Sequence, residues 1–154
     1  MKMDPISSYP GSDASPKQII ALAEQYRAAA EILHRDGPRG HARRWAPFRL
    51  CACQAIELCL SAALRHAGME AALVRGMHHK LKERLDLLDP AAPLSDKARE
   101  RLILLEERRE YLVVRYDAAR LNQTLHPDAL LATVQEVEAV VRQLVADELK
   151  PPRA

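Results

Sequence analysis

The sequence predicts an all-α protein that folds as a single domain. Alanine (25) and leucine (22), two of the strongest helix formers, supply 47 of the 154 residues. Only 6 residues are aromatic and 5 are glycine, whereas β-sandwiches and barrels need β-branched and aromatic residues and frequent turn glycines. Hydrophobic residues make up 48% of the chain, which is enough for a compact core and excludes wholesale disorder.

The charged residues are balanced overall but unevenly distributed. The 23 basic and 21 acidic side chains leave a net charge of +2, which does not by itself indicate a nucleic-acid or membrane binder. Residues 27–49 carry a local charge of +4, and residues 127–149 carry a local charge of −4. Two interpretations stay open for the basic segment. It is either a solvated surface or a site for phosphate or an acidic partner, formed by Arg35, Arg39, His41, Arg43 and Arg44.

The cysteines, the histidines and the hydropathy pattern predict a cytoplasmic protein without a metal or cofactor. Cys51, Cys53 and Cys59 fall in one predicted helix, where positions 51 and 53 are about 200° apart, so we expect structural thiols in a reducing compartment. Neighbours such as His78 and His79 also point in different directions, which favours a structural role. The first 13 residues lack the apolar segment of a signal peptide. No apolar run approaches the roughly 20 residues of a membrane span.

Two long helices follow a predicted flexible tail of residues 1–14. Ser15-Pro16 supplies an N-cap and a proline at the first helical position, and apolar residues recur at three- and four-residue spacing up to residue 35. Residues 36–40 contain the strongest helix breaker in the chain. The second helix begins between residues 44 and 47 and ends at Gly68, its expected C′ residue. Small residues interrupt its apolar face, so we expect it to be the central helix.

Shorter segments divide the rest of the predicted domain, which extends to residue 150. Residues 70–75 form a turn of helix before Gly76. A third helix ends at residues 89–90 and places four apolar side chains on one face: Met77, Leu81, Leu85 and Leu88. Ser95 caps a fourth helix that runs towards Arg109. For residues 111–125 the sequence leaves two structures possible: the end of that helix or a short extended piece. The last helix begins at residues 126–128 and ends at residues 150–151, and residues 151–154 form a C-terminal tail.

Three segments of the chain carry a family resemblance. Residues 55–64, followed by Gly68, resemble the second helix of HEPN domains. Residues 76–81, with Gly76 and His78, resemble the Gly-His-x-Leu step that opens the third helix of these domains. Arg115-Tyr116 before the last amphipathic helix is also similar to members of the family. The resemblance is strongest over residues 55–81.

The resemblance implies an up-and-down bundle of four to five helices that acts as a homodimer. Many HEPN domains are metal-independent ribonucleases of toxin–antitoxin or defence systems. Others have no known activity and pair with a nucleotidyltransferase-like protein or bind nucleotides. Because the second and last predicted helices carry long apolar stripes with small residues, we expect the dimer face there.

Arg120 and His126 fit the catalytic pair that the resemblance implies. Active members carry an arginine and a histidine, with four to six residues between them, near the entry to the last helix. The arginine would anchor the phosphate, and the histidine would exchange protons with the RNA 2′-hydroxyl. The spacing itself is uninformative, because 17 arginines and 6 histidines produce such pairs by chance. Leu121 and Pro127 also depart from the residues that active members place after this arginine and histidine.

The sequence therefore supports three functional hypotheses. The first is a non-catalytic or partner-dependent HEPN-like homodimer that associates with a nucleotide, with RNA or with a nucleotidyltransferase-like protein. The second is a metal-independent ribonuclease that uses Arg120 and His126. The third is a protein-interaction adaptor that uses the basic residues 27–49. The alternative to catalysis is that His126 caps the last helix while Arg120 pairs with a nearby acid.

Overall fold

The computed structural model describes residues 9–37, 45–88, 90 and 92–152. Within these ranges the chain forms eight α-helices and one 3₁₀ helix and no strand. The predicted all-α class is therefore confirmed. The described part contains nine helices where the sequence predicts four to five, because several of the expected segments are divided into short helices.

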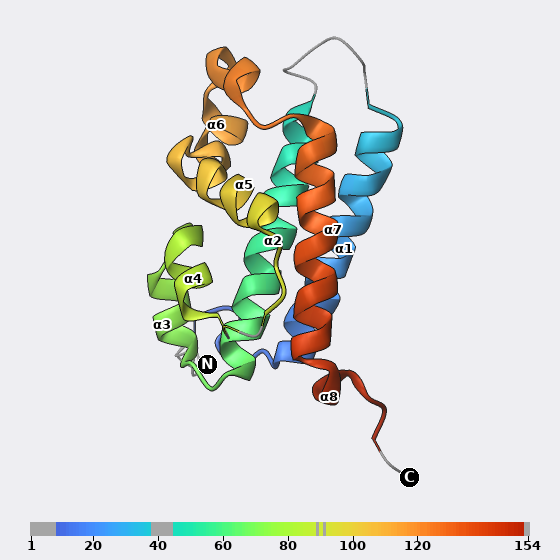
Figure 1. Cartoon of the computed structure of the whole chain (residues 1–154), viewed down its shortest axis with the longest axis vertical. Coiled ribbons are helices and arrows are strands. Elements are labelled where there is room, and N and C mark those ends of the chain that lie inside the picture. Colours follow the sequence, from blue (N-terminus) through green and yellow to red (C-terminus); the bar gives the residue numbers. More distant parts are fainter. Residues whose placement is uncertain (1–8, 38–44, 89, 91, 153–154) are drawn as a thin grey trace, which may run out of the picture.

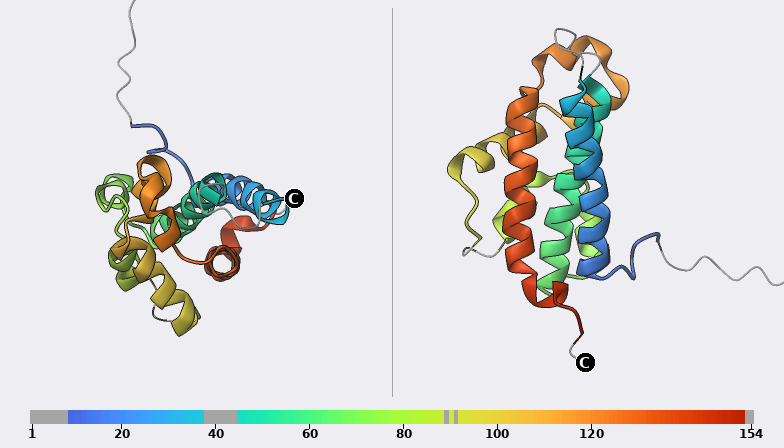
Figure 2. Two further views of the ribbon diagram at one scale, coloured as in Figure 1. Left: turned by 90° about the horizontal axis from the view of Figure 1, so that it is seen from above. Right: turned by 90° about the vertical axis from the view of Figure 1, so that its right-hand side faces the viewer.

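Three long helices form the body of the molecule: α1 (Pro16–Arg35), α2 (Ala46–His66) and α7 (Pro127–Leu144). They lie side by side, with α2 and α7 running in the same direction and α1 running opposite to them (Figures 1 and 2). Helix α2 contacts α1, α3, α4, α6 and α7. Alanines are buried on several of its faces, at positions 52, 55, 62 and 63, which permits close approach of its neighbours. The prediction of a central second helix is confirmed.

The composition of α2 also meets the criteria of a membrane span. Its length and mean hydropathy suffice for one, but 56% of its most apolar window is buried inside the protein. Most of this window therefore packs in the core of the protein. Ala62 is fully buried within the chain, whereas Leu50 on the same helix stays 37% exposed. Ala62 therefore contributes nothing to an outer surface.

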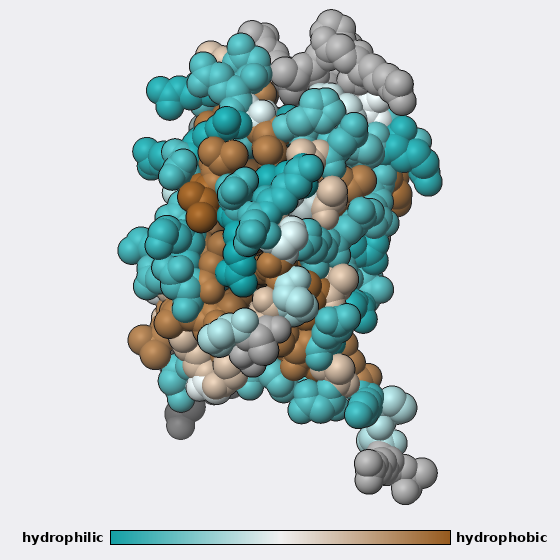
Figure 3. Space-filling view, in the orientation of Figure 1, coloured by the Kyte–Doolittle hydropathy of each residue, from teal (hydrophilic) through white to brown (hydrophobic). Residues whose placement is uncertain are grey.

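Six short helices complete the chain: α3 (Ala71–Gly76), α4 (Leu81–Leu87), α5 (Asp96–Glu107), α6 (Glu110–Tyr116), η2 (Ala118–Gln123) and α8 (Ala146–Leu149). The first five return the chain along the side of α2 to the start of α7 (Figure 1). In the orientation of Figure 3, mostly hydrophilic side chains cover the surface, and apolar side chains show between them.

The helix boundaries follow local capping signals where such signals exist. Ser15 forms a capping box with Gln18, and Ser95 accepts a hydrogen bond from the Ala98 backbone at 3.1 Å. Gly68 has a φ of +93°, the left-handed conformation that ends many helices. The predicted starts of the first and fourth helices and the predicted end of the second are confirmed.

Two boundaries differ from the sequence prediction because single residues adopt left-handed backbone. The predicted helix from Met77 begins only at Leu81, because His78 has a φ of +46° and interrupts it. Arg109 has a φ of +52° and separates α5 from α6. Residues 111–116, whose structure the sequence leaves open, are helical. The predicted last helix ends at Leu144, and the separate turn α8 follows.

Residues 9–14 differ in character from the flexible tail that the sequence predicts. They form a turn, with hydrogen bonds from Ser12 N to Tyr9 O at 2.9 Å and from Ala14 N to Gly11 O at 3.1 Å. Five of these residues line the cleft described below. Residues 1–8 and 153–154 of the predicted tails lie outside the described residues.

Candidate ligand-binding cleft

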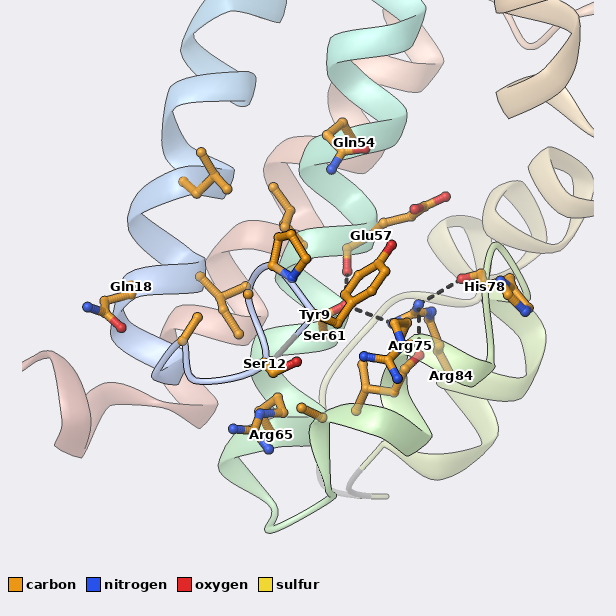
Figure 4. A pocket seen from close by; sticks show the side chains of 18 of the residues that line it. Tyr9, Ser12, Gln18, Gln54, Glu57, Ser61, Arg65, Arg75, His78 and Arg84 are labelled. Carbon is orange, nitrogen blue, oxygen red and sulfur yellow. Dashed lines mark hydrogen bonds between the residues drawn. The ribbon is translucent and has the colours of Figure 1, made fainter. Parts of the chain in front are cut away.

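A cleft of about 580 Å³ lies between α1, α2, α3 and the turn at residues 9–14. Its size falls within the range of small-molecule sites. The first half of α1 and the second half of α2 face it, and α3 and the 77–80 turn close its side (Figure 4). The stretch with the strongest family resemblance, residues 55–81, supplies much of this lining.

The part of the lining that α1 and α2 form combines apolar side chains with polar ones such as Gln54 and Glu57. Ile19 and Leu22 come from α1, and Leu58 comes from α2. Leu22 stays 49% exposed, so the cleft presents apolar surface to solvent rather than burying it. A ligand with an apolar portion would gain from covering this surface.

Arg84 forms the buried base of the cleft. The residue is only 4% exposed, and its guanidinium donates hydrogen bonds to Ser61 Oγ at 2.8 Å, Val74 O at 3.3 Å and His78 O at 2.7 Å. These bonds connect α4 to α2, to α3 and to the turn between α3 and α4. The arginine therefore fixes the wall of the cleft and stabilises the left-handed conformation of His78.

The positive charge of Arg84 has no carboxylate partner within the described residues. All three of its acceptors are neutral oxygens, and its Nε has no hydrogen-bond partner. Burial lowers the pKa of this guanidinium, although arginine stays protonated in proteins. Buried charges are normally paired, whereas Arg84 forms no ion pair within the described residues, and the carboxylates of Glu57 and Glu83 act on its charge only at longer range.

Two further arginines extend the positive charge to the rim. Arg65 Nη1 donates to Met69 O at 3.1 Å, while its Nε is buried without a partner. Arg75 is exposed, and its guanidinium carbon lies 4.3 Å from the centroid of the Tyr9 ring. Neither arginine forms an ion pair in the described part of the chain. The polar rim therefore favours an anionic group such as phosphate or carboxylate.

Among the described residues that line the cleft, Glu57 is the only acidic one. Its carboxylate lies 2.5 Å from His79 Nδ1, and the His79 ring stacks on Tyr111 with centroids 3.9 Å apart. This contact connects α2, the 77–80 turn and α6. Glu57 is thus engaged by a histidine, and His79 has the structural role that the sequence predicts.

Arg120 and His126 make local contacts outside the cleft. Arg120 Nε lies 3.3 Å from Asp117, and its side chain is 68% exposed. His126 is the N-cap of α7: its Nδ1 accepts a hydrogen bond from Asp128 N at 3.2 Å, and its side chain is 73% exposed. Arg120 thus pairs with a nearby acid, and His126 caps the last helix. These are the contacts expected from the sequence if the two residues are not catalytic.

The other sequence-predicted positions are distributed over the molecule. Arg35 pairs with Asp36, while Arg39, His41, Arg43 and Arg44 lie outside the described residues. Of the family positions, His78 lines the cleft and Gly76 ends the adjacent α3. Arg115 and Tyr116 are exposed in α6, so the family positions do not form one cluster.

Metal ligation finds no support in the described residues, where no group of three or more His, Cys, Asp or Glu side chains is placed to hold an ion. The three cysteines are free thiols. Burial raises the pKa of Cys53 and raises the pKa of Cys59 to about 12. These two thiols are therefore protonated and unreactive at neutral pH.

Among the cleft residues that sequence reasoning missed are its three arginines and its tyrosine: Tyr9, Arg65, Arg75 and Arg84. They come from four separate segments of the chain, and no spacing rule relates them. Arg84 alone carries a signal, because it interrupts the apolar face of Leu81, Leu85 and Leu88 at helical spacing. A charged residue in a buried stripe indicates a packed or functional charge.

Comparison of the chain with protein-family models finds no match. Comparisons with curated proteins and with solved structures also find no match.

Proposed function

We propose that the chain is an HEPN-like module that binds a phosphate-bearing ligand, a nucleotide or RNA, in the cleft between α1, α2 and α3. The buried, unpaired charge of Arg84 is the observation that carries this proposal. A phosphate placed near the base of the cleft would supply the missing negative charge. Arg65 and Arg75 at the rim would provide further donors.

The apolar lining of the cleft supports an organic ligand over a free inorganic anion. Ile19, Leu22 and Leu58 offer surface that a phosphate alone would leave uncovered. A site that combines apolar walls with a few directed polar groups is typical of small-molecule binding.

Calorimetric titration with ribose 5-phosphate and with adenosine 5′-monophosphate tests the proposal. We expect saturable binding with one site per chain. Arg75→Gln should weaken binding about tenfold, the effect of losing one charge-assisted hydrogen bond. Arg108→Gln is the matched control, because Arg108 is an exposed arginine that does not line the cleft. Absence of binding by both probes, or an equal loss in the control variant, would contradict the proposal.

We further propose that the module has no ribonuclease activity of its own and acts as a cytoplasmic homodimer with a protein partner of the nucleotidyltransferase-like class. The local contacts of Arg120 and His126 support the first point. Purified protein should leave single-stranded RNA intact in EDTA. Cleavage that His126→Ala abolishes would instead establish the ribonuclease alternative. Sedimentation velocity at micromolar concentration tests the dimer, and a monomer would contradict it.

A further inference from the structure

The Tyr9 ring is the most exposed large aromatic side chain among those that line the cleft. The residue is 61% exposed, and the guanidinium of Arg75 lies against its ring at 4.3 Å from the centroid. The ring lies between the labelled side chains of Glu57 and Arg75 (Figure 4). The guanidinium lies over one face of the ring, so a planar ring of a ligand would stack on the opposite face.

The backbone around Tyr9 holds this ring in a defined place. Its carbonyl accepts the hydrogen bond from Ser12 N, and Gly11 makes the turn with a φ of +87°. The turn leads directly into the Ser15 capping box at the start of α1. An exposed ring on such an anchored turn costs little conformational entropy when it binds a second ring.

We infer that Tyr9 and Arg75 form a stacking subsite for a planar ring of the ligand, so that the ligand is a mononucleotide. This inference rests on the proposed function. Stacking on tyrosine requires a π-face, and Arg75 behind the ring adds a cation–π contact. A sugar phosphate offers no such face.

The dimensions and the remaining polar groups of the cleft agree with a single nucleotide unit. A cleft of about 580 Å³ accommodates one ring, one sugar and its phosphate within the usual range for small molecules. The amide of Gln54 lines the same cleft and can pair with ring heteroatoms. The phosphate then lies towards Arg65 and Arg84, whose Nε atoms have no hydrogen-bond partner in the described part of the chain.

Substitution of Tyr9 tests the subsite without disturbing the core. Calorimetry compares the wild type, Tyr9→Ala and Tyr9→Phe with three probes: adenosine 5′-monophosphate, ribose 5-phosphate and a single-stranded oligoadenylate. We expect the wild type to bind the mononucleotide about tenfold more tightly than the sugar phosphate, the usual effect of one stacked base. Tyr9→Ala should remove this difference and leave sugar phosphate binding unchanged, while Tyr9→Phe should retain it.

Each other outcome overturns a specific statement. Equal affinities for the mononucleotide and the sugar phosphate would overturn the stacking subsite and leave the proposed function intact. Binding of neither probe would overturn the proposed function and the subsite with it. Tighter binding of the oligoadenylate than of the mononucleotide, dependent on Tyr9, would identify the ligand as RNA and overturn the mononucleotide assignment.

Discussion

Two arginines are buried in the part of the protein that the structure describes, and they differ in what compensates their charge. Arg49 in α2 is 3% exposed and Arg84 in α4 is 4% exposed. Arg49 lies 3.7 Å from Glu110, which is fully buried, and also donates to the carbonyl of Leu125. Arg84 has only Ser61 and two backbone carbonyls as acceptors.

The charge of Arg49 is therefore structural, whereas the charge of Arg84 is available to a ligand. The pair of Arg49 and Glu110 connects α2, α6 and the segment before α7, because Leu125 N also donates to Glu110 at 2.5 Å. Its charges neutralise each other inside the fold. Arg84 forms no ion pair in the described part of the chain, where Glu57 and Glu83 act on its charge only at longer range, and it lies at a cleft. The absence of a counter-ion, rather than burial itself, distinguishes the candidate site.

Arg49→Met should produce the largest loss of stability. It leaves the carboxylate of Glu110 buried without its cation, a change that costs about 3–5 kcal/mol. Urea unfolding monitored by circular dichroism measures the loss. The double variant Arg49→Met/Glu110→Leu should recover much of it, because both charges are then removed. A loss below about 1 kcal/mol in the single variant would show that this pair does not act as a structural unit.

The same variant should depend on pH in a defined direction. Burial raises the pKa of Glu110 above its ordinary value of 4.5, and removal of Arg49 raises it further. A carboxyl with a raised pKa in the folded state is neutral in both states below pH 4.5, and its penalty develops as the pH rises through the folded pKa. The stability difference between Arg49→Met and the wild type should therefore be smaller at pH 4 than at pH 7.

Arg84→Met should cost less stability than Arg49→Met but should weaken ligand binding strongly. The loss of three hydrogen bonds, without a stranded charge, costs about 2 kcal/mol. Affinity for adenosine 5′-monophosphate should fall at least tenfold by calorimetry. Arg84→Lys retains the charge without the planar fork, so it should recover part of the affinity. Full affinity in Arg84→Met would place the phosphate away from the base of the cleft.

The sequence predicts the long helices well because their signals are local. The capping residues Ser15 and Ser95, the left-handed Gly68 and the apolar stripes all act within a few residues. The break at His78 has no such signal. Its left-handed backbone is stabilised by a hydrogen bond from Arg84 to its carbonyl, and that contact exists only after α4 has packed against α2 and α3.

The cleft was beyond sequence reasoning for the same reason. Tyr9, Arg65, Arg75 and Arg84 are brought together by the packing of a terminal turn, α2, α3 and α4. The sequence identifies the segment that carries the family resemblance, residues 55–81, and this segment does line the cleft. It does not identify which side chains of that segment face one another, because no hydrophobic period determines the position of a polar side chain on the rim.

His126→Ala should have a smaller effect, confined to the start of α7. Removal of an N-cap side chain costs about 1 kcal/mol, here because Asp128 N loses its acceptor. Arg120→Ala should cost less, since an exposed ion pair contributes little. Neither variant should alter binding of the mononucleotide. Thermal unfolding and calorimetry measure both quantities, and a loss of affinity in either variant would connect this end of the molecule with the ligand site.

The smallest expected effect is at Gly76, next to the cleft wall that Arg84 holds. A Cβ at Gly76 meets no atom within 4 Å, and its backbone is not left-handed. Because alanine restricts the unfolded chain more than glycine does, Gly76→Ala should stabilise the protein by about 0.4–1 kcal/mol. Ligand affinity should stay unchanged. Gly68→Ala is the matched comparison: its φ of +93° makes alanine unfavourable there by about 1–2 kcal/mol. Destabilisation by Gly76→Ala would contradict this expectation. It would show that glycine is needed at position 76 for a reason other than its φ angle or the space around its Cα.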